Sequence, residues 1–339
     1  MTGSMLIKHI ASNLMSLSGF LSLAEHCYFS DKAFILMYHR ISDSVADQPY
    51  HVQPGMVVST INFEKQVEYL KKRFKVVFLE DIAGMIEKGE NIGGSCAITF
   101  DDGWLDNYAE AYPILSKYKA PATIFLTTCF VGTNKLFWPE EICYYLEQFI
   151  ILKPIADCAP SSFKLFVEDI NDYKSYNKVV LFDKAIEILK GYLPSERDEI
   201  LEYFRSQFNR DLIPRQMLDW HEAREMLASG LIRFGAHTHN HVILDQVPGL
   251  IVNEETLKSR EEIEKQLEVS INTFAYPNGN FNESIQKILS ENGFSSAVTT
   301  CKGFVDKKTP LMAIPRIGVH DDVSNTLPMF RSRILFKKF

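Results

Sequence analysis

Short apolar runs recur along most of the chain, separated by segments with helical spacing. The run at residues 34–38 is continuous, which is typical of a strand buried on both faces. Similar runs follow at 75–79, 96–100, 122–126, 232–236, 273–276 and 296–299. Apolar residues spaced by three and four predict helices between most of them, for example at 63–74, 80–88 and 107–118. This alternation predicts an α/β fold with a parallel sheet, and seven or so strands favour a barrel over an open sheet.

The alternation stops at residues 137–214, where the sequence predicts charged helices, including 140–148 and 176–192. Helices inserted after a barrel strand usually lie over the barrel mouth, so we expect a cap. The sequence therefore predicts an N-terminal amphipathic helix and arm at 1–32, a barrel formed by 33–136 and 215–339, and a helical cap insertion at 137–214.

The two ends of the chain combine apolar and basic residues. An apolar stripe with helical spacing is formed by Ile7, Ile10, Leu14, Leu17 and Leu21. Residues 330–339 mix four cations with large apolar side chains. Two interpretations stay open: peripheral contact of residues 1–30 and 330–339 with an anionic membrane, or packing of the helix across the closed end of the barrel while the tail frays.

Composition narrows the class of protein. The chain is 46% hydrophobic and 23% charged, as expected for a packed globular protein. A net charge of -7 argues against nucleic acid as a partner. Six scattered cysteines without C-x-x-C spacing predict buried, reduced thiols. No apolar run approaches the roughly twenty residues that span a bilayer. We expect a cytoplasmic protein, which in the membrane-binding interpretation lies at the inner face of the membrane.

A first chemical cluster, Thr-Phe-Asp-Asp-Gly-Trp at 99–104, directly follows a predicted strand, where an α/β barrel has its active site. The adjacent carboxylates of Asp101 and Asp102 raise each other's pKa unless a cation or a proton separates their roles. In the alternative interpretation, one Asp caps the next helix and the other is solvated.

A second cluster, Gly-Ala-His-Thr-His-Asn-His at 235–241, follows another predicted strand. The spacing of His237 and His241 lets two imidazoles reach one ion from a single turn, whereas His239 should face away. Together with a carboxylate of the first cluster they form a two-histidine, one-carboxylate set that leaves positions open for water and substrate. The sequence thus predicts one divalent ion, with Zn²⁺ preferred and Co²⁺, Ni²⁺ or Fe²⁺ as alternatives.

These motifs resemble those of the polysaccharide deacetylases with a NodB homology domain, carbohydrate esterase family 4, whose fold is a distorted (β/α)7 barrel. Residues 99–103 resemble the first family motif and His237-Thr-x-x-His241 resembles the second. The third is resembled by Phe-Ala-Tyr-Pro-Asn-Gly-Asn at 274–280. The resemblance covers most of the chain except residues 1–30 and much of the insertion.

The resemblance implies a general base at Asp101 and a metal held by Asp102, His237 and His241. It also implies that the backbone N–H of Asn278, where many relatives have Tyr, stabilises the oxyanion.

Two further roles are less closely matched. Relatives often have an Arg where this chain has Ala275, and Arg316, after a strand-like segment at 312–314, is our candidate for supplying that guanidinium. A surface ion pair is the alternative for Arg316. For the proton donor to the leaving amine, the candidates are His320 and His39, with a supporting structural role as the alternative.

The expected function is metal-dependent removal of an N-acetyl group from an amino sugar of a polysaccharide or lipid-linked glycan. One alternative is a deformylase or another amide hydrolase on the same fold. Another is a non-catalytic sugar-binding module with a structural metal. Structural zinc is usually bound by four protein ligands rich in cysteine, and no cysteine lies near either cluster, which argues against this alternative.

Overall fold

A computed structural model describes residues 3–43, 52, 55–152, 159–173, 177–208 and 214–336 of the chain. The chain divides into two compact units. The first comprises Met1–Asp43, Gly55–Thr133 and Met217–Phe339, and the second comprises Ser44–Pro54 and Asn134–Gln216. The domain boundaries drawn from the sequence stay a prediction.

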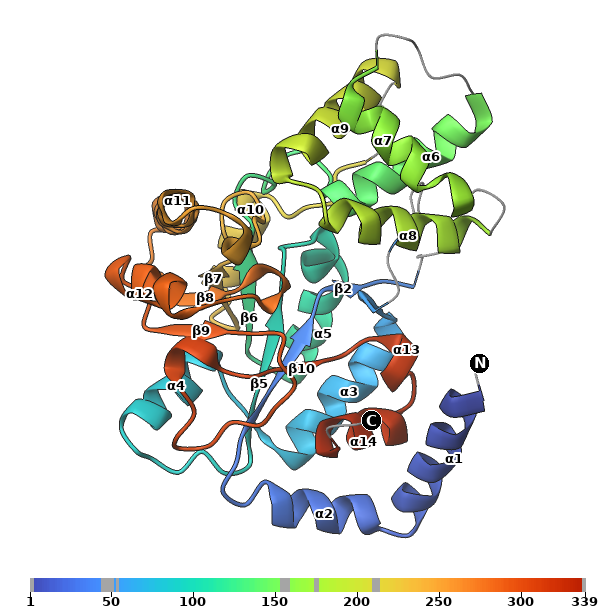
Figure 1. Cartoon of the computed structure of the whole chain (residues 1–339). Coiled ribbons are helices and arrows are strands. Elements are labelled where there is room, and N and C mark those ends of the chain that lie inside the picture. Colours follow the sequence, from blue (N-terminus) through green and yellow to red (C-terminus); the bar gives the residue numbers. More distant parts are fainter. Residues whose placement is uncertain are drawn as a thin grey trace. The chain divides into compact units, whose positions relative to one another are not determined.

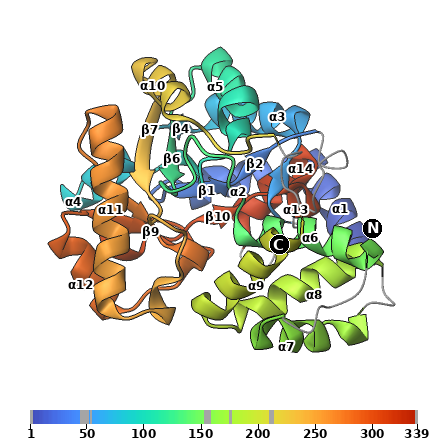
Figure 2. The ribbon, with the colours of Figure 1, turned by 90° about the horizontal axis from the view of Figure 1, so that it is seen from above.

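The first unit contains a curved parallel sheet (Figure 1, Figure 2). Its strands are β1 (Phe34–Tyr38), β4 (Lys75–Val76), β5 (Ser95–Phe100), β6 (Ala122–Leu126), β7 (Ile232–Ala236), β8 (Thr273–Ala275), β9 (Ser296–Val298) and β10 (Ile317–Gly318). The strand order is β10-β1-β5-β6-β7-β8-β9, with β4 beside β5. Val298 of β9 forms a parallel bridge with Ile314, just before β10, so the order closes on itself. This confirms the predicted distorted (β/α)7 barrel.

The residues inside and outside the barrel explain the continuous apolar runs. Every residue of β5 is buried. Ala97 points to an inner cluster that also contains residues of α4 (Leu79–Glu87), whereas Ile98 and Phe100 pack in the outer core. The outer helices are α3 (Thr60–Arg73), α5 (Tyr112–Tyr118), α10 (Trp220–Ala228), α11 (Gly249–Leu267), α12 (Glu283–Glu291), α13 (Asp321–Ser324) and α14 (Leu327–Leu335). A strand covered on both faces has no room for alternating polar residues.

Two expectations about strands are wrong. Of the run at 75–79, only Lys75–Val76 is a strand, and Leu79 already begins α4. The strand-like segment at 312–314 lies partly in a 3-10 turn, Leu311–Ala313, and the last barrel strand is Ile317–Gly318. Pro310 and Pro315 flank the turn, and proline cannot donate to a strand ladder.

The N-terminal stripe is part of two helices, α1 (Gly3–Leu17) and α2 (Phe20–Tyr28), which are separated at Gly19 with its left-handed φ of 75°. Of the predicted stripe, Leu21 is buried, but Ile7, Ile10, Leu14 and Leu17 are exposed. The first helix packs on α14 through Ser12, as one of the two interpretations predicts, but these four side chains take no part in the packing. Within the described ranges, no helix combines the length and the apolar character needed to cross a bilayer.

The basic tail at the other end of the chain begins inside a helix. Residues 330–335 belong to α14, and residues 337–339 lie outside the described residues. Phe330, Ile334 and Leu335 are buried, so this part of the tail packs against the barrel unit.

The second unit is helical, with α6 (Trp138–Leu152), α7 (Ser161–Asp169), α8 (Lys178–Lys190) and α9 (Pro194–Gln207). Tyr145 stacks on Phe204 with 5.6 Å between the ring centroids, and Phe163 meets the same ring edge-on at 4.9 Å. The buried carboxylate of Glu141 accepts two hydrogen bonds from Arg205, of 2.9 and 2.7 Å. The helices expected near 140–148 and 176–192 correspond to α6 and α8, and a role as a cap stays a prediction.

The cysteines differ in exposure. Cys96 and Cys143 are buried free thiols, as expected, but Cys27 and Cys301 are exposed. Cys158 lies outside the described residues. The expectation of uniformly buried thiols is therefore wrong, because two of them lie on surface helices or loops.

Candidate active site

Two loops with strained backbone carry the first two sequence motifs. Asp102 follows β5 with a φ of 77°, and Thr238 and His241 follow β7 with φ of 63° and 58°. Residues other than glycine rarely adopt this left-handed region of φ, and backbone strain of this kind is concentrated at functional sites. Gly103, at φ 83°, has no room for a side chain, because a Cβ would lie 2.7 Å from Leu126 Cδ2. The local geometry turns both loops at the carboxyl ends of their strands.

These loops bring together one carboxylate and two imidazoles. Asp102, His237 and His241 each offer a ligand atom, and these atoms lie within 4.8 Å of one another. Asp102 Oδ1 is 3.5 Å from His237 Nε2 and 3.4 Å from His241 Nε2. One oxygen and two imidazole nitrogens suit a catalytic divalent ion, because three protein ligands leave coordination positions open.

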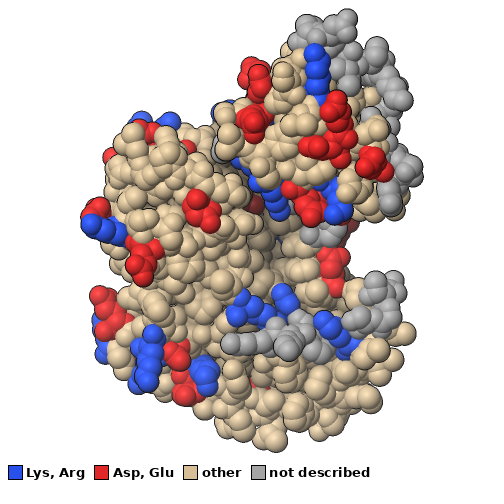
Figure 3. Space-filling view, in the orientation of Figure 1, with Lys and Arg blue, Asp and Glu red and all other residues tan. Residues whose placement is uncertain are grey.

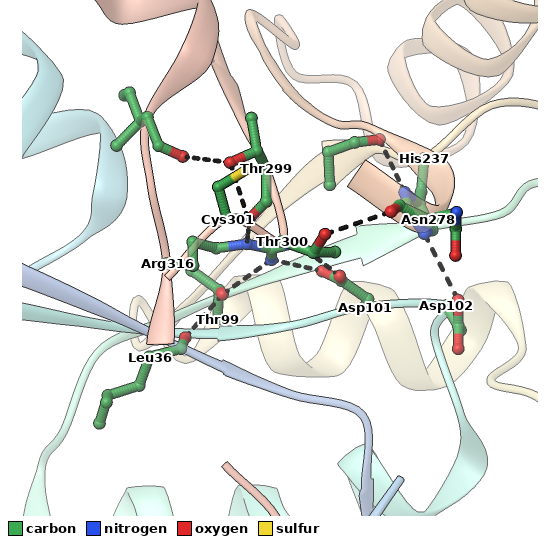
Figure 4. A network of polar contacts seen from close by, with 12 residues as sticks. Leu36, Thr99, Asp101, Asp102, His237, Asn278, Thr299, Thr300, Cys301 and Arg316 are labelled. Atoms are coloured by element: carbon green, nitrogen blue, oxygen red, sulfur yellow. Dashed lines mark hydrogen bonds and ion pairs between the residues drawn. The ribbon is translucent and has the colours of Figure 1, made fainter. Parts of the chain in front are cut away.

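Contacts behind these side chains orient them (Figure 4). His237 Nδ1 lies 2.7 Å from the Ala275 carbonyl oxygen, which can only accept, so Nδ1 donates to this oxygen and Nε2 is the ring nitrogen that faces Asp102. Trp104 Nε1–H donates to Asp102 Oδ2 at 2.9 Å, which leaves Oδ1 directed at the histidines. Outer contacts of this kind accompany metal ligands in proteins. The residues therefore fit a divalent metal.

Charge distribution supports the same conclusion. Burial lowers the pKa of His241 to about 4, so this imidazole is neutral at pH 7. Burial raises the pKa of Asp102, but the hydrogen bond with His237 and the nearby histidines outweigh it and hold the pKa below its usual value. For His237, burial lowers the pKa, and the hydrogen bond with Asp102 reverses the direction. A carboxylate beside a neutral imidazole is ready to bind a cation.

Asp101 is not part of this group, because both oxygens of its carboxylate accept hydrogen bonds from a buried guanidinium. Arg316 Nη1 and Nη2 donate to the two oxygens of Asp101 at 2.7 and 2.6 Å (Figure 4). Arg316 also donates from Nε to the Thr299 carbonyl, and it is completely buried. Burial raises the pKa of Asp101, but Arg316 outweighs it, so the pKa lies below its usual value. The alternative of a surface ion pair for Arg316 is wrong.

The two candidate proton donors differ in their surroundings. His39 follows β1, is partly buried, and contributes, after stronger neighbours, to lowering the pKa of both Asp101 and Asp102. His320 precedes α13, and its Nδ1 lies 3.2 Å from Asp322 Oδ2. Burial lowers the pKa of His320, and His39 is one of the charges that lower it further. Of the two candidates, it is His39 that is among the charges that lower the pKa of both carboxylates.

Asn278 lies in the turn that follows β8, Pro277–Gly279, with a left-handed φ of 57°. Thr300 Oγ1 donates to its carbonyl oxygen at 3.2 Å. The neighbouring Gly279, at φ 80°, cannot carry a Cβ, which would lie 2.0 Å from Thr300 Oγ1. The turn therefore has a fixed backbone, one strand away from the loop that carries His237.

Sequence reasoning missed the part played by Trp104. The indole is 1% exposed, donates to Asp102, and lies under the Arg40 guanidinium at 4.4 Å from the ring centroid. Its position at the end of the first motif was the only signal. His239, by contrast, faces Thr128, with 2.8 Å between Nδ1 and Oγ1, and is not part of the metal-binding group.

Comparison with known proteins agrees with this geometry. The family model described as polysaccharide deacetylase matches residues 88–297. The chain belongs to this family. It is 33% identical to a poly-beta-1,6-N-acetyl-D-glucosamine N-deacetylase of Staphylococcus aureus strain MSSA476 over 155 aligned residues. This alignment covers 44% of the chain. The chain spans about half of that relative's length, 51%.

Two solved structures share the fold of this family member. Streptococcus pyogenes deacetylase PplD, in complex with acetate, matches with a TM-score of 0.55 and 21% identity, over 86% of this chain and 94% of PplD. IcaB from Ammonifex degensii matches with a TM-score of 0.55 and 19% identity, over 90% of this chain and 98% of IcaB. At these identities the similarity shows the barrel fold.

Proposed function

We propose that the chain is a metal-dependent deacetylase that removes the N-acetyl group from an amino sugar in a glycan. The observation that carries this proposal is the pair of neighbouring carboxylates with separate partners: Asp102 faces two histidines, and Asp101 faces Arg316. Membership of the polysaccharide deacetylase family supports it. The name of the Staphylococcus relative makes poly-beta-1,6-N-acetylglucosamine the first substrate to test.

The metal would be held by Asp102, His237 and His241, with Zn²⁺ as the first candidate. Such an ion lowers the pKa of water and polarises an acyl oxygen. Asp101 accepts the proton of the attacking water as general base. Its low pKa keeps it ionised at neutral pH, and each oxygen has a lone pair left beside its bond to Arg316.

Two further groups complete the proposed reaction. The backbone N–H of Asn278 donates to the oxyanion that develops on the former carbonyl oxygen, and the fixed left-handed turn presents it without reorganisation. His39 protonates the departing amine, a role supported by its coupling to both carboxylates. His320, whose Nδ1 lies 3.2 Å from Asp322 Oδ2, is the alternative proton donor.

Release of acetate tests the proposal. Metal-loaded protein is incubated with poly-beta-1,6-N-acetylglucosamine, chitin oligomers, sugar nucleotides and lipid-linked N-acetyl sugars, and N-formyl analogues are included. We expect acetate from at least one acetylated glycan, and release that is roughly 10²- to 10⁴-fold slower from the Asp101→Asn variant. Formate release without acetate would identify a deformylase instead. Sugar binding without release of either acid would contradict the enzymatic proposal.

A further inference from the structure

The exposed apolar side chains of the described residues are concentrated on the first two helices. Of the 13 large apolar side chains that are exposed, eight belong to residues 6–28: Leu6, Ile7, Ile10, Leu14, Leu17, Phe20, Leu23 and Tyr28. Figure 3 shows a broad surface without charged groups over α1 and α2. Contiguous apolar surface of this kind marks an interaction site in a folded protein. We call these eight residues the N-terminal apolar face.

The two helices are fixed to the barrel by their other sides. Ser12 of α1 is buried and lies 3.4 Å from Met329 Sδ of α14. Glu25 of α2 is buried and accepts hydrogen bonds of 2.9 and 3.0 Å from Arg331. Arg331 also donates to Ser22 at 2.9 Å. The packing side of each helix is thus already occupied, and the apolar face points outward on a fixed support.

Exposed acidic groups are few beside this face, and the exposed carboxylate of Asp31, after α2, pairs with Lys32 at 3.4 Å. Glu25, the one acidic residue of α1 and α2, is buried in its pair with Arg331. Burial, followed by the nearby charges of Arg333 on α14 and Lys8 on α1, lowers the pKa of Lys302 to about 7, so these three basic residues lie close together. Figure 3 shows Lys and Arg side chains gathered beside this surface. This local excess of cations stands against a net charge of -7 for the whole chain.

From these observations we propose that the N-terminal apolar face binds the surface of an anionic phospholipid bilayer. An amphipathic surface flanked by cations binds in the interfacial plane by burying apolar groups and attracting lipid phosphates. A second copy of the chain fits less well, since a two-fold interface through this face would bring the same cations together. The proposal is independent of the function of the barrel.

Vesicle flotation of the full chain tests this proposal. We expect the wild-type protein to float with vesicles of phosphatidylcholine and phosphatidylglycerol, less with phosphatidylcholine alone, and less again at high salt. Ile7→Glu combined with Leu14→Glu should lower the bound fraction roughly tenfold, because it places carboxylates against apolar lipid and like charge. Leu250→Glu is the matched control, since Leu250 is 70% exposed and Ile7 is 69% exposed. The control should float like the wild type.

A second readout separates the membrane from other occupants. Trp emission of a Leu17→Trp variant should shift to the blue with anionic vesicles, and sedimentation without lipid should give a monomer. Wild-type protein that stays unbound by anionic vesicles would overturn the proposal, as would equal flotation of the double variant. A lipid-free dimer that dissociates in the double variant would assign the face to a second copy. Circular dichroism checks that each variant is folded.

Discussion

At the scale of single residues, the site separates two adjacent carboxylates by their partners. Asp102 Oδ1 faces His237 and His241, whereas both oxygens of Asp101 face Arg316. An environment that gives neighbouring titratable groups different partners also gives them different roles. This division can be tested by changing one carboxylate at a time.

Asp101→Asn should lower the deacetylation rate by roughly 10²- to 10⁴-fold, the usual contribution of a general base, and leave metal bound. Asp102→Asn should lower the bound metal as well, because it changes a ligand of a three-ligand site. Metal content by elemental analysis and acetate release by coupled assay measure the two effects. Equal loss of metal in both variants would contradict the assignment.

Trp104 is a positioning residue in this arrangement, since it acts through Asp102. Trp104→Phe removes the 2.9 Å hydrogen bond to Asp102 Oδ2 and should weaken metal affinity by about 10- to 100-fold. Competition with a chromophoric chelator measures the affinity. Trp220→Phe makes the same exchange on α10 and controls for the lost indole. Unchanged affinity in Trp104→Phe would show that the bond does not orient the ligand.

His241 gives the metal-free protein a defined pH dependence. Its pKa is about 4 in the folded chain and about 6.5 when unfolded. The unfolded state therefore takes up the proton first as pH falls. The stabilisation from neutral His241 is present above about pH 6.5 and is lost as pH falls towards about 4.

We therefore expect the free energy of unfolding of chelator-treated wild type to fall across this window relative to His241→Gln. Urea titrations at several pH values measure the difference. His26→Gln, on the exposed side of α2, controls for removal of an imidazole. A constant difference between wild type and His241→Gln would contradict the low pKa.

At the scale of elements, strands that are buried on both faces were predictable and elements set by local breaks were not. The runs at 34–38, 122–126 and 232–236 coincide with β1, β6 and β7. The last strand, Ile317–Gly318, is two residues long and too short to give a periodic signal. A single glycine at position 19 divides the predicted N-terminal helix, because its left-handed φ ends the first helix.

The residues of the site were also predictable in part: those beside a motif were found, and long-range partners were not. Residues next to motifs were found from spacing, because a strand end fixes where the following side chains point. The partner of Asp101 lies 215 residues away, and no local pattern marks such a contact. Arg316 was therefore proposed from a resemblance, and its burial came from the structure alone.

The turn Pro277–Gly279 offers a test at this scale. Gly279→Ala should destabilise the fold by about 1–3 kcal/mol and lower activity, because the Cβ at φ 80° would also meet Thr300. Gly89→Ala is matched, since Gly89 has φ 67° and a Cβ at this position would meet nothing within 4 Å. Gly89→Ala should keep full activity. Denaturant unfolding measures the loss of stability caused by backbone strain. Acetate release measures the loss of activity caused by displacement of the turn.

At the scale of the whole molecule, the segment Asn134–Gln216 begins and ends at neighbouring points of the barrel unit. Gly132 N–H donates to the Leu218 carbonyl at 2.7 Å, and Leu218 N–H donates to the Gly103 carbonyl at 2.9 Å. The segment Asn134–Gln216 is thus joined to the barrel unit by two stretches of backbone that lie side by side. Its two attachment points are held together within the barrel unit itself.

Replacing residues 134–216 by a short Gly-Ser linker should therefore leave a folded barrel that binds metal and has a changed substrate preference. Circular dichroism, thermal unfolding and metal content test the fold, and the glycan panel tests preference. A truncated protein that does not fold would show that the helical unit is needed for the barrel core.

The ion pair between Asp101 and Arg316 has a consequence for how the protein is made. During synthesis on the ribosome, the three side chains of the candidate metal site, Asp102, His237 and His241, are present long before residue 316 emerges. Until then Asp101 has no guanidinium, and burying an unpaired carboxylate costs several kcal/mol. A prematurely terminated chain keeps the ligands but cannot close the barrel around them, and proteases act on such open states. Chains that end before residue 316 should therefore be degraded faster than the complete chain.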